Sequence, residues 1–147
     1  MARRPPRRLV KAVTALALFA YRASRGHIGG RFGHVRVLLL TTTGRKTGKR
    51  RTTPLGYLET DGRIVIIASF GGSDVHPAWY LNLAANPEVE ARLGAGTPRP
   101  MRARTATSEE REELWPKVVE LWKGYGRYQA KTAREIPFVI LEPRRGG

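Results

Sequence analysis

The sequence contains no cysteine, and this absence removes several kinds of chemistry at once. Disulfide bonds, thiolate catalysis and cysteine-ligated metal sites are all excluded. Acidic residues are also scarce: only two aspartates occur, Asp61 and Asp74, and the glutamates concentrate in residues 109–120. A pair of carboxylates acting as general acid and base is therefore not expected. The three histidines lack partners at metal-ligand spacing, so no metal site is predicted.

A long hydrophobic run is missing as well. The longest apolar stretch, residues 12–20, is shorter than the roughly 20 residues that a membrane-spanning helix needs. What the chain has in excess is positive charge, with a formal net charge of +15 over 147 residues. Such a balance indicates an anionic partner: nucleic acid, an anionic membrane surface, or a phosphorylated or carboxylated small molecule.

The N-terminal residues predict a basic amphipathic helix and linker over residues 1–30, ahead of a single domain over residues 31–147. Leu9, Val13, Leu16 and Ala20 fall on one helical face, with Tyr21 beside it. One interpretation is a helix that closes one end of the core. A second interpretation is a helix that lies on an anionic membrane surface, and a third is a secretory signal peptide.

Three apolar segments follow with short connections, namely "HVRVLLLTT", "RTTPLGYLE" and "RIVIIAS". This spacing predicts an antiparallel meander instead of a βαβ unit. Asp61 and Gly62 predict a tight hairpin turn between the second and third segments. Pro54 predicts that its position in the second strand lies at an edge or a bulge.

The rest of the chain alternates between helical and strand patterns. Pro77 to Asn86 predicts a short helix, "EVEARL" and "PMRARTA" predict a hairpin, and "IPFVILEP" predicts a final strand. Thr107 and Glu110 have the spacing of a capping box before another helix. About six strands and three or four short helices predict a small α+β protein built on a β-barrel or roll.

The most unusual stretch is "GRKTGKRR", where five positive charges occupy the seven positions from Arg45 to Arg51. Like charges this close repel one another unless an anion docks there. The stretch resembles a phosphate-binding P-loop, but Gly44 and Gly48 are too close together and Arg50 replaces the required Ser or Thr. With few acid–base groups elsewhere, the pattern favours a bound cofactor that carries the chemistry and an anionic tail.

The segments "TTGRKTGKRRTTPLGYL", "IASFGG", "HPAWYLNLAANPEVE" and "IPFVILEP" together resemble the deazaflavin-dependent nitroreductase family, from roughly Val35 to Pro143. The resemblance implies an antiparallel split β-barrel, similar to the roll of FMN-binding proteins, with flanking helices. It also implies binding of the deazaflavin coenzyme F420. Members pass a hydride from the reduced coenzyme to quinones, nitroaromatics or activated alkenes such as enones.

The resemblance also implies which residues hold the coenzyme. They lie in a basic turn, a strand, the end of a second strand and the start of a helix: Arg45, Lys46, Thr47; Arg51, Thr52, Thr53, Pro54, Leu55, Gly56; Ile67, Ala68, Ser69, Phe70; Ala78, Trp79, Tyr80, Leu81, Asn82. Tyr125 is placed beside the ring and the substrate.

Ser69, Tyr125 and Tyr128 are the expected catalytic residues. Ser69 and Tyr125 would donate hydrogen bonds to the acceptor, and both tyrosines would cover it. Gly56 stands where some members of the family carry a tyrosine, and the extra room favours a broad quinone as acceptor. For Trp79, packing against Leu83 in the core is an equally good interpretation.

Two other functions remain open from the residues alone. One is a non-catalytic barrel that binds nucleic acid through the basic turn and stacks bases on aromatic side chains. The other is an FMN-binding oxidoreductase, although one phosphate suits five clustered cations less well than a longer polyanion does. We expect a coenzyme-dependent enzyme without a nucleic-acid partner. We expect it in the cytoplasm, with the N-terminal helix as the candidate contact to the inner face of the cell membrane.

Overall fold

The protein is described here by a computed structural model. Its description covers five groups of residues, namely 16, 18, 20 and 21, residues 31–32, residues 35–68, residues 76–121 and residues 136–144. The catalytic residues expected from the sequence, Ser69, Tyr125 and Tyr128, lie outside the described residues, as does Phe70.

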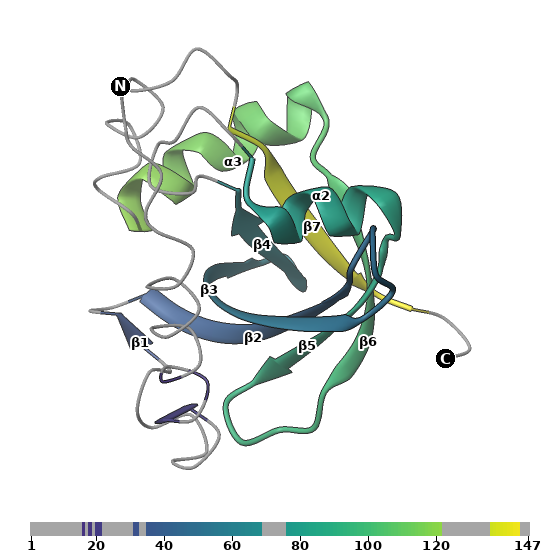
Figure 1. The fold of residues 1–147 in the computed structure, drawn as a ribbon. Helices are drawn as coiled ribbons and strands as arrows, with labels where there is room; N and C mark the ends of the chain where they lie inside the picture. Colours follow the sequence, from purple (N-terminus) through teal and green to yellow (C-terminus); the bar gives the residue numbers. More distant parts are fainter. Residues whose placement is uncertain are drawn as a thin grey trace, which may run out of the picture.

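Seven antiparallel strands form one sheet in the order β1-β2-β3-β4-β7-β6-β5 (Figure 1). Their bounds are β1 Arg31–Phe32, β2 Val35–Thr43, β3 Arg50–Thr60, β4 Arg63–Ile67, β5 Glu88–Leu93, β6 Arg99–Thr105 and β7 Phe138–Pro143. An additional pairing of β2 with β5, from Leu38↔Leu93 to Thr41↔Glu90, closes six of the strands into a barrel. The α+β split-barrel prediction is thereby confirmed.

The turn between β3 and β4 shows why the meander forms here. Thr60 pairs with Arg63, so only Asp61 and Gly62 connect the two strands. Their φ angles are 52° and 73°. Two successive positive φ angles match the twist of the flanking strands, and glycine adopts such an angle without steric cost. The predicted hairpin turn is confirmed.

Pro54 lies where β3 has a strand partner on one side only. Residues Arg50–Tyr57 of β3 pair with β2, whereas β4 pairs only with Tyr57–Thr60. In the described part of the chain, the other side of β3 is therefore open from Arg50 to Gly56. A residue without an N–H is tolerated at such an edge. The edge position predicted for Pro54 is confirmed.

The interior of the barrel is filled by alternate residues of several strands. Leu38 and Leu40 of β2, Ile66 of β4 and Leu141 of β7 are all fully buried in one apolar cluster. Strand residues two apart face the same side, so the period-2 pattern of the sequence selects this set. The barrel is thus a packed core.

Helix α3, Ser108–Leu121, covers the outside of the barrel and forms a second apolar cluster with it. Leu114 and Val118 of α3 pack there with Phe138 and Ile140 of β7. The Thr107 hydroxyl accepts the backbone N–H of Glu110 at 3.2 Å, and the Glu110 carboxylate accepts the N–H of Thr107 at 3.0 Å. The predicted capping box is confirmed.

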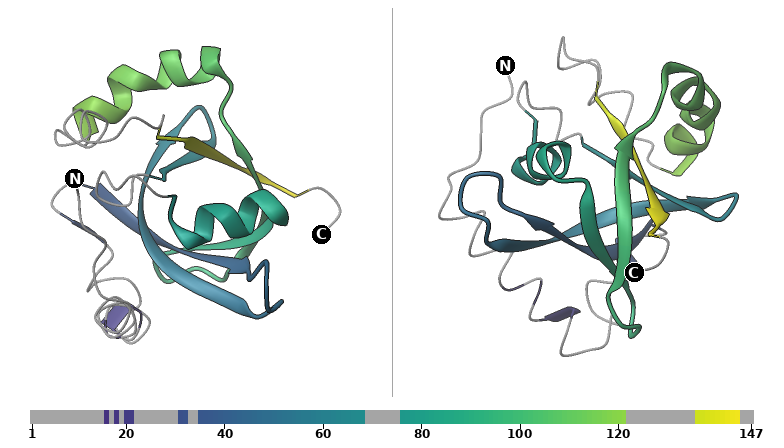
Figure 2. Two further views of the ribbon diagram at one scale, coloured as in Figure 1. Left: turned by 45° about the horizontal axis from the view of Figure 1, so that its top comes forward. Right: turned by 90° about the vertical axis from the view of Figure 1, so that its right-hand side faces the viewer.

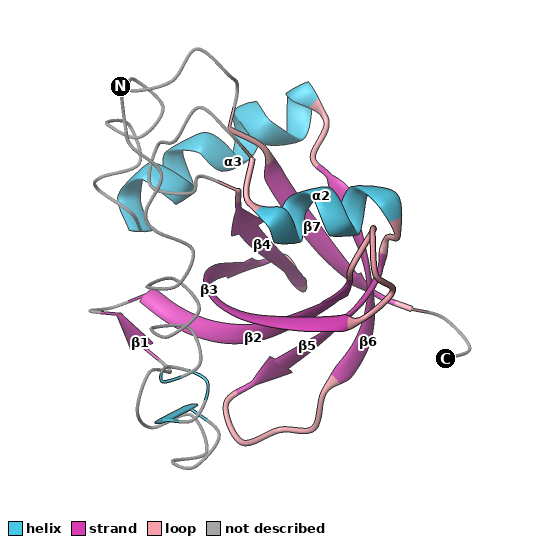
Figure 3. Ribbon diagram, in the orientation of Figure 1, coloured by secondary structure: helices cyan, strands magenta, loops and turns pink. Residues whose placement is uncertain are grey.

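Helix α2, Ala78–Ala85, lies on the opposite side of β7 from α3 (Figure 2). It packs against β2 and β6, where it lies close to the end of the β2–β3 hairpin (Figure 3). Trp79 and Leu83, one helical turn apart, both belong to the barrel core. The core-packing interpretation of this pair is therefore confirmed. Pro77 precedes the first helical residue, as its missing N–H allows.

The N-terminal segment contacts the barrel at the fully buried side chain of Tyr21. Its hydroxyl accepts the backbone N–H of Gly94 at 2.7 Å and donates to the carbonyl of Val37 at 3.1 Å. Val37 and Gly94 would be the next pair of the ladder beyond Leu38↔Leu93, the terminal β2–β5 pair. The Tyr21 hydroxyl therefore bridges β2 and β5 at the point where their direct pairing ends. Leu16 is 69% exposed. None of the helices within the described residues is long and apolar enough to span a membrane.

One charged cluster ties α3 to the sheet. The Glu110 carboxylate accepts hydrogen bonds from Nη1 and Nη2 of Arg104 at 2.7 and 2.9 Å, and from Arg63 at 3.0 Å. Arg104 also bonds Glu142 of β7. The hydrogen bonds from Arg104, followed by the one from the Thr107 N–H, lower the pKa of Glu110 to about 2. The Glu110 side chain is 19% exposed and that of Arg104 is 38% exposed, so water screens these contacts in part.

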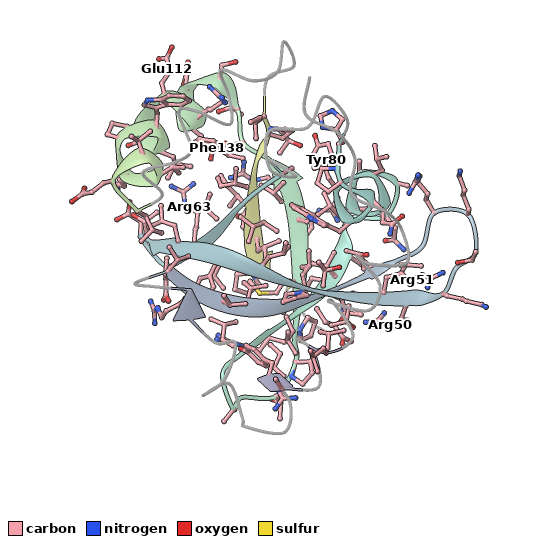
Figure 4. The ribbon with its side chains drawn as sticks, turned by 60° about the vertical axis from the view of Figure 1, so that its left-hand side comes forward. Arg50, Arg51, Arg63, Tyr80, Glu112 and Phe138 are labelled. Carbon is pink, nitrogen blue, oxygen red and sulfur yellow. The ribbon has the colours of Figure 1, made fainter. Side chains whose placement is uncertain are left out.

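We predict that Glu110→Gln lowers the free energy of unfolding at pH 7 by about 1–2 kcal/mol, because a lowered carboxyl pKa is itself a stability term and solvent screening reduces it. This contribution is fully present above the unfolded-state pKa and is lost as the pH falls towards 2. Denaturant unfolding at several pH values measures it, with Glu112→Gln as the control. Glu112 is an exposed neighbour on the outer face of α3 (Figure 4). Equal losses for the two variants would contradict the assignment.

Candidate functional site

The basic turn, defined here as Gly44–Lys49, joins β2 to β3 in a tight hydrogen-bonded loop. The N–H of Gly44 donates to the carbonyl of Lys49 at 2.7 Å, and the N–H of Gly48 donates to the carbonyl of Gly44 at 2.8 Å. Gly48 has a φ of 70°, which favours glycine. The paired residues Thr43 and Arg50 hold the two ends of the turn together. The turn is thus a defined extension of the barrel.

Gly44 has a packing role in the turn. A side chain at this position would place its Cβ 2.9 Å from the Thr47 hydroxyl and 3.2 Å from the Lys49 carbonyl. Because glycine leaves this space free, the Thr47 hydroxyl can accept the backbone N–H of Lys49 at 3.2 Å. The bond directs the Thr47 side chain across the turn and leaves the hydroxyl proton available to an acceptor.

Two backbone N–H groups at the tip of the turn have no acceptor among the described residues. They belong to Lys46 and Thr47, both exposed. Successive free N–H groups of this kind can donate to one anion together. The turn can therefore bind an anion through its backbone as well as through its basic side chains.

The charges of the basic stretch are not all equivalent. Arg50 forms an ion pair with Glu90 of β5 at 3.1 Å. Lys46, Lys49 and Arg51 are exposed and have no carboxylate partner in the described part of the chain, and the same holds for Arg45. Successive strand residues point to opposite faces, which separates Arg51 from the paired Arg50. Four of the five cations are thus free to attract an anionic ligand.

The free cations lie at one end of an electrically asymmetric molecule. Arg50 and Arg51 lie beside the basic turn, whereas Glu112 on α3 lies at the far end (Figure 4). Five glutamates belong to α3: Glu109, Glu110, Glu112, Glu113 and Glu120. The cations without a carboxylate partner therefore attract an anionic ligand to the end of the molecule that carries the turn.

Asn82 of α2 joins the helix to the basic turn. Its side-chain oxygen accepts the backbone N–H of Arg45 at 3.2 Å and the Arg45 Nη1 at 3.0 Å. Its Nδ2 donates to the Thr42 hydroxyl at 3.4 Å. Asn82 is 5% exposed and Thr42 is 1% exposed. The structure thus brings two residues expected at the coenzyme site, Arg45 and Asn82, into direct contact.

The open edge of β3 starts directly at the turn. It carries Arg51, exposed, and the partly buried residues Thr52, Thr53, Pro54, Leu55 and Gly56. The Thr52 hydroxyl bonds the Thr41 hydroxyl at 2.9 Å, and Leu55 packs against the barrel core. Every second residue along this edge directs its backbone polar groups away from β2, to a side where no described strand pairs with them. A ligand that extends from the turn can therefore run along β3.

The side chains at the end of β4 pack into the apolar clusters of the protein. Ile67 packs in the cluster under α3, and Ala68 is fully buried in the barrel core. The Ala68 N–H donates to the Pro137 carbonyl at 3.0 Å. The role expected of Ile67 and Ala68 beside the coenzyme stays a prediction, as does that of Ser69 and Phe70, which lie outside the described residues.

The start of α2 divides into a buried and an accessible part. Trp79 is 8% exposed and belongs to the core, whereas Ala78 is exposed and Leu81 is partly buried. The partly buried Tyr80 places its hydroxyl 3.0 Å from that of Thr105, and its ring lies 4.8 Å from the His76 ring. Tyr80 is thus the aromatic side chain that α2 can present to a ligand.

Sequence reasoning missed Thr42 and Glu90. Thr42 continues the inward-facing series Leu38 and Leu40, so a polar residue at an apolar position was the available signal. For Glu90 no signal existed, because its pairing with Arg50 depends on the β2–β5 closure of the barrel. Among the described residues, no group of acidic or histidine side chains could hold a metal ion.

Comparisons with known proteins identify relatives of the chain in sequence and in structure. Residues 15–143 match the family described as F420H(2)-dependent quinone reductase. The sequence is 40% identical over 133 residues to the F420H(2)-dependent quinone reductase Rv1261c of Mycobacterium tuberculosis, covering 84% of this chain and 85% of that relative.

Two solved structures are similar over most of their length. The F420-H2 dependent reductase FDR-A aligns with a TM-score of 0.65 and 44% identity, covering 72% of this chain and 93% of that chain. A second structure, described as a domain-swapped dimer, aligns with a TM-score of 0.68 and 36% identity, covering 94% of this chain and 100% of that chain.

Proposed function

The chain belongs to the F420H(2)-dependent quinone reductase family, and from this premise we propose that it reduces quinones with the coenzyme F420. The observation that carries the proposal is the basic turn, with three cations that lack a carboxylate partner among the described residues and two free N–H groups, together with the exposed Arg51 beside it. A phosphate followed by several glutamate carboxylates offers a matching series of negative charges. A flavin mononucleotide offers a single phosphate, and would leave most of these cations without a partner.

The residues present fit the coenzyme at its anionic end. Arg45, Lys46 and Thr47 would hold the phosphate and the glutamate tail, with Arg51 beside them at the start of β3. Cations and backbone N–H groups together make strong charge-assisted hydrogen bonds to such oxygens. The open edge of β3 from Thr52 to Gly56 would then lie along the ring system. Tyr80 and Leu55 would contribute apolar contacts from two sides.

Reduced F420, once bound, supplies a hydride to an electron-poor acceptor. The role of this chain is to bind the coenzyme and to orient it towards the acceptor. The turn fixes the anionic end, the β3 edge fixes the ring, and the barrel core beneath excludes water from one side of the ring. We place Ser69 and Tyr125 as hydrogen-bond donors to the acceptor oxygen, and Tyr128 over the acceptor.

A quinone is the acceptor that we favour, with nitroaromatics and enones as further candidates. Gly56 has no side chain at a place where the family resemblance implies a tyrosine in some members, so a broad ring can approach the β3 edge. Reduction of a quinone to the hydroquinone takes up one hydride and one proton. The open edge of β3 from Thr52 to Gly56 carries no carboxylate that could supply that proton, so the tyrosines or water are its proposed sources.

We further propose contact of the N-terminal segment with the inner face of the cell membrane. Leu16, 69% exposed, supports this, together with the basic residues Arg3, Arg4, Arg7 and Arg8. Basic side chains are attracted to anionic lipids and an exposed leucine inserts at the interface. Tyr21 would keep the segment attached to the barrel.

We predict that F420 binds much more tightly than flavin mononucleotide, and that the loaded enzyme oxidises reduced F420 in the presence of menadione. The reason is the match between a polyanionic tail and the uncompensated cations of the turn. Fluorescence titration measures the two affinities, and anaerobic absorbance of the reduced coenzyme measures turnover. Equal affinities would contradict the tail assignment. Tight coenzyme binding without reduction of menadione, a cyclohexenone or a nitroimidazole would contradict the reductase function.

We predict that Lys46→Ala and Arg51→Ala each weaken F420 binding by about 1–3 kcal/mol, the range for a lost charged hydrogen bond. The double variant Arg50→Ala/Glu90→Ala is the matched control from the same stretch. It removes a compensated pair and leaves no new carboxylate beside the turn, so the effect on binding should be within about 0.5 kcal/mol. Binding to the wild-type protein should weaken as salt is added. If the double variant weakens binding as much as Lys46→Ala or Arg51→Ala, the predicted contacts of these two side chains with the tail are wrong.

We predict that the protein co-sediments with vesicles that contain anionic lipid and that Leu16→Asp reduces this binding, because a charge replaces the exposed apolar group. Vesicles of neutral lipid are the control, and the dichroism spectrum checks that the barrel remains folded. Binding that is absent from the wild-type protein, or unchanged by Leu16→Asp, would rule out contact through this residue.

A further inference from the structure

We propose that Asn82 is a positioning residue that holds Arg45 ready for the anionic end of the ligand. The inference rests on the proposed function, since the ligand is the F420 tail. It assigns to Asn82 a role through Arg45, in place of a direct bond from its side chain to the coenzyme.

The hydrogen bonds of Asn82 are arranged around Arg45. Oδ1 accepts both the backbone N–H of Arg45 at 3.2 Å and its Nη1 at 3.0 Å. The two bonds together fix the main chain of the turn at this residue and the direction of its guanidinium. A carboxamide oxygen has two lone pairs, and Arg45 uses both. The oxygen therefore has no remaining capacity to accept a hydrogen bond from a coenzyme.

Burial makes this arrangement rigid. Asn82 is 5% exposed and lies on α2 between the core residues Trp79 and Leu83. A buried amide that loses its partners is costly, so the helix keeps its side chain in one orientation. The bond from Nδ2 to the buried Thr42 hydroxyl at 3.4 Å supports the same orientation from β2. Arg45 is thereby tied to both α2 and β2.

The contact matters because the turn is otherwise exposed. Arg45 and the residues after it up to Arg51 are all exposed, and each long side chain loses rotamer freedom when it grips an anion. Fixing Arg45 beforehand removes part of that cost, which is the effect of preorganisation. One Nη1–H of Arg45 is used by Asn82, and the other guanidinium N–H groups can face an anion.

The neutrality of Asn82 is part of the proposal. An aspartate at this position would hold Arg45 at least as firmly, but its negative charge would compensate the guanidinium. The pair Arg50 and Glu90 shows the result of such compensation in the same stretch. The amide holds the arginine in place and leaves its full charge for the ligand.

A double-mutant cycle on F420 binding tests the proposal. We expect Asn82→Ala to weaken binding about threefold to tenfold, the effect of lost hydrogen bonds of this type. In an Arg45→Ala background, the same change should have an effect of less than about twofold, because Asn82 acts through Arg45. Asn86→Ala is the matched control, since this asparagine caps the end of the same helix and its side chain, among the described residues, accepts the N–H of Glu88 at 3.2 Å and makes no bond to Arg45. Independent, multiplicative effects of Asn82→Ala and Arg45→Ala would overturn the positioning role.

The Asn82→Asp variant distinguishes the effect of holding Arg45 in position from the effect of leaving its charge uncompensated. It should weaken F420 binding and also flatten the dependence of affinity on salt, because one cation of the turn is then compensated. Asn82→Ala should leave the salt dependence nearly unchanged. An Asp variant with wild-type affinity and salt dependence would overturn the role assigned to the neutral amide.

A measurement without coenzyme separates this proposal from the proposed function. Exchange of the Arg45 amide hydrogen should be slower in the wild-type protein than in Asn82→Ala, because Asn82 is the acceptor of this N–H within the described residues. In Asn86→Ala the exchange should equal that of the wild-type protein. Unchanged exchange in Asn82→Ala would overturn the proposal. If exchange responds as expected but the wild-type protein does not bind F420, the proposed function fails while the contact between Asn82 and Arg45 stands.

Discussion

The antiparallel register between β2 and β3 is the constraint on which the rest of the structure depends. The two strands pair without interruption from Arg36↔Tyr57 to Thr43↔Arg50, and the basic turn begins directly after the last pair. This register places Leu38 and Leu40 in the barrel and Arg51 at the start of an open edge. A slip by one residue would exchange the two faces and move the charged end of β3. The position of the turn therefore follows from the packing of the barrel.

The same barrel explains how a crowded set of cations is tolerated. The chain compensates one of them with Glu90, from a strand that reaches the hairpin only because the barrel closes. It secures another through the uncharged Asn82 on α2, and leaves the remaining ones to solvent or ligand. At the other end, Glu110 and its arginines stabilise the attachment of α3. The arginines paired with Glu110 and Glu90 thus serve stability, whereas the cations of the basic stretch without a carboxylate partner are the ones that can attract an anion.

Much of the fold was predictable because its determinants are local. Alternating apolar residues, the Asp61–Gly62 turn, Pro54 at an edge and the Thr107–Glu110 capping box each specify their element within a few positions. The closure of β2 on β5 was not predictable from a pattern, because both strands carry the same alternation whether the sheet is open or closed. The basic turn was recognised as a site from its charge density alone. The different roles of its cations could not be predicted, because Asn82 and Glu90, the partners of Arg45 and Arg50, lie far from them in the sequence. Ser69, Tyr125 and Tyr128 keep their expected roles as predictions from the family resemblance.

The central claim is that the basic turn binds the anionic tail of F420. The most direct measurement compares the dissociation constants of F420 and of a deazaflavin that has the same ring but lacks the phosphate and glutamate tail, at low and at high salt. If the turn holds the tail, the tailless compound binds at least about tenfold more weakly at low salt, and its affinity barely changes with salt. Equal affinity of the two compounds, with the same response to salt, would contradict the claim.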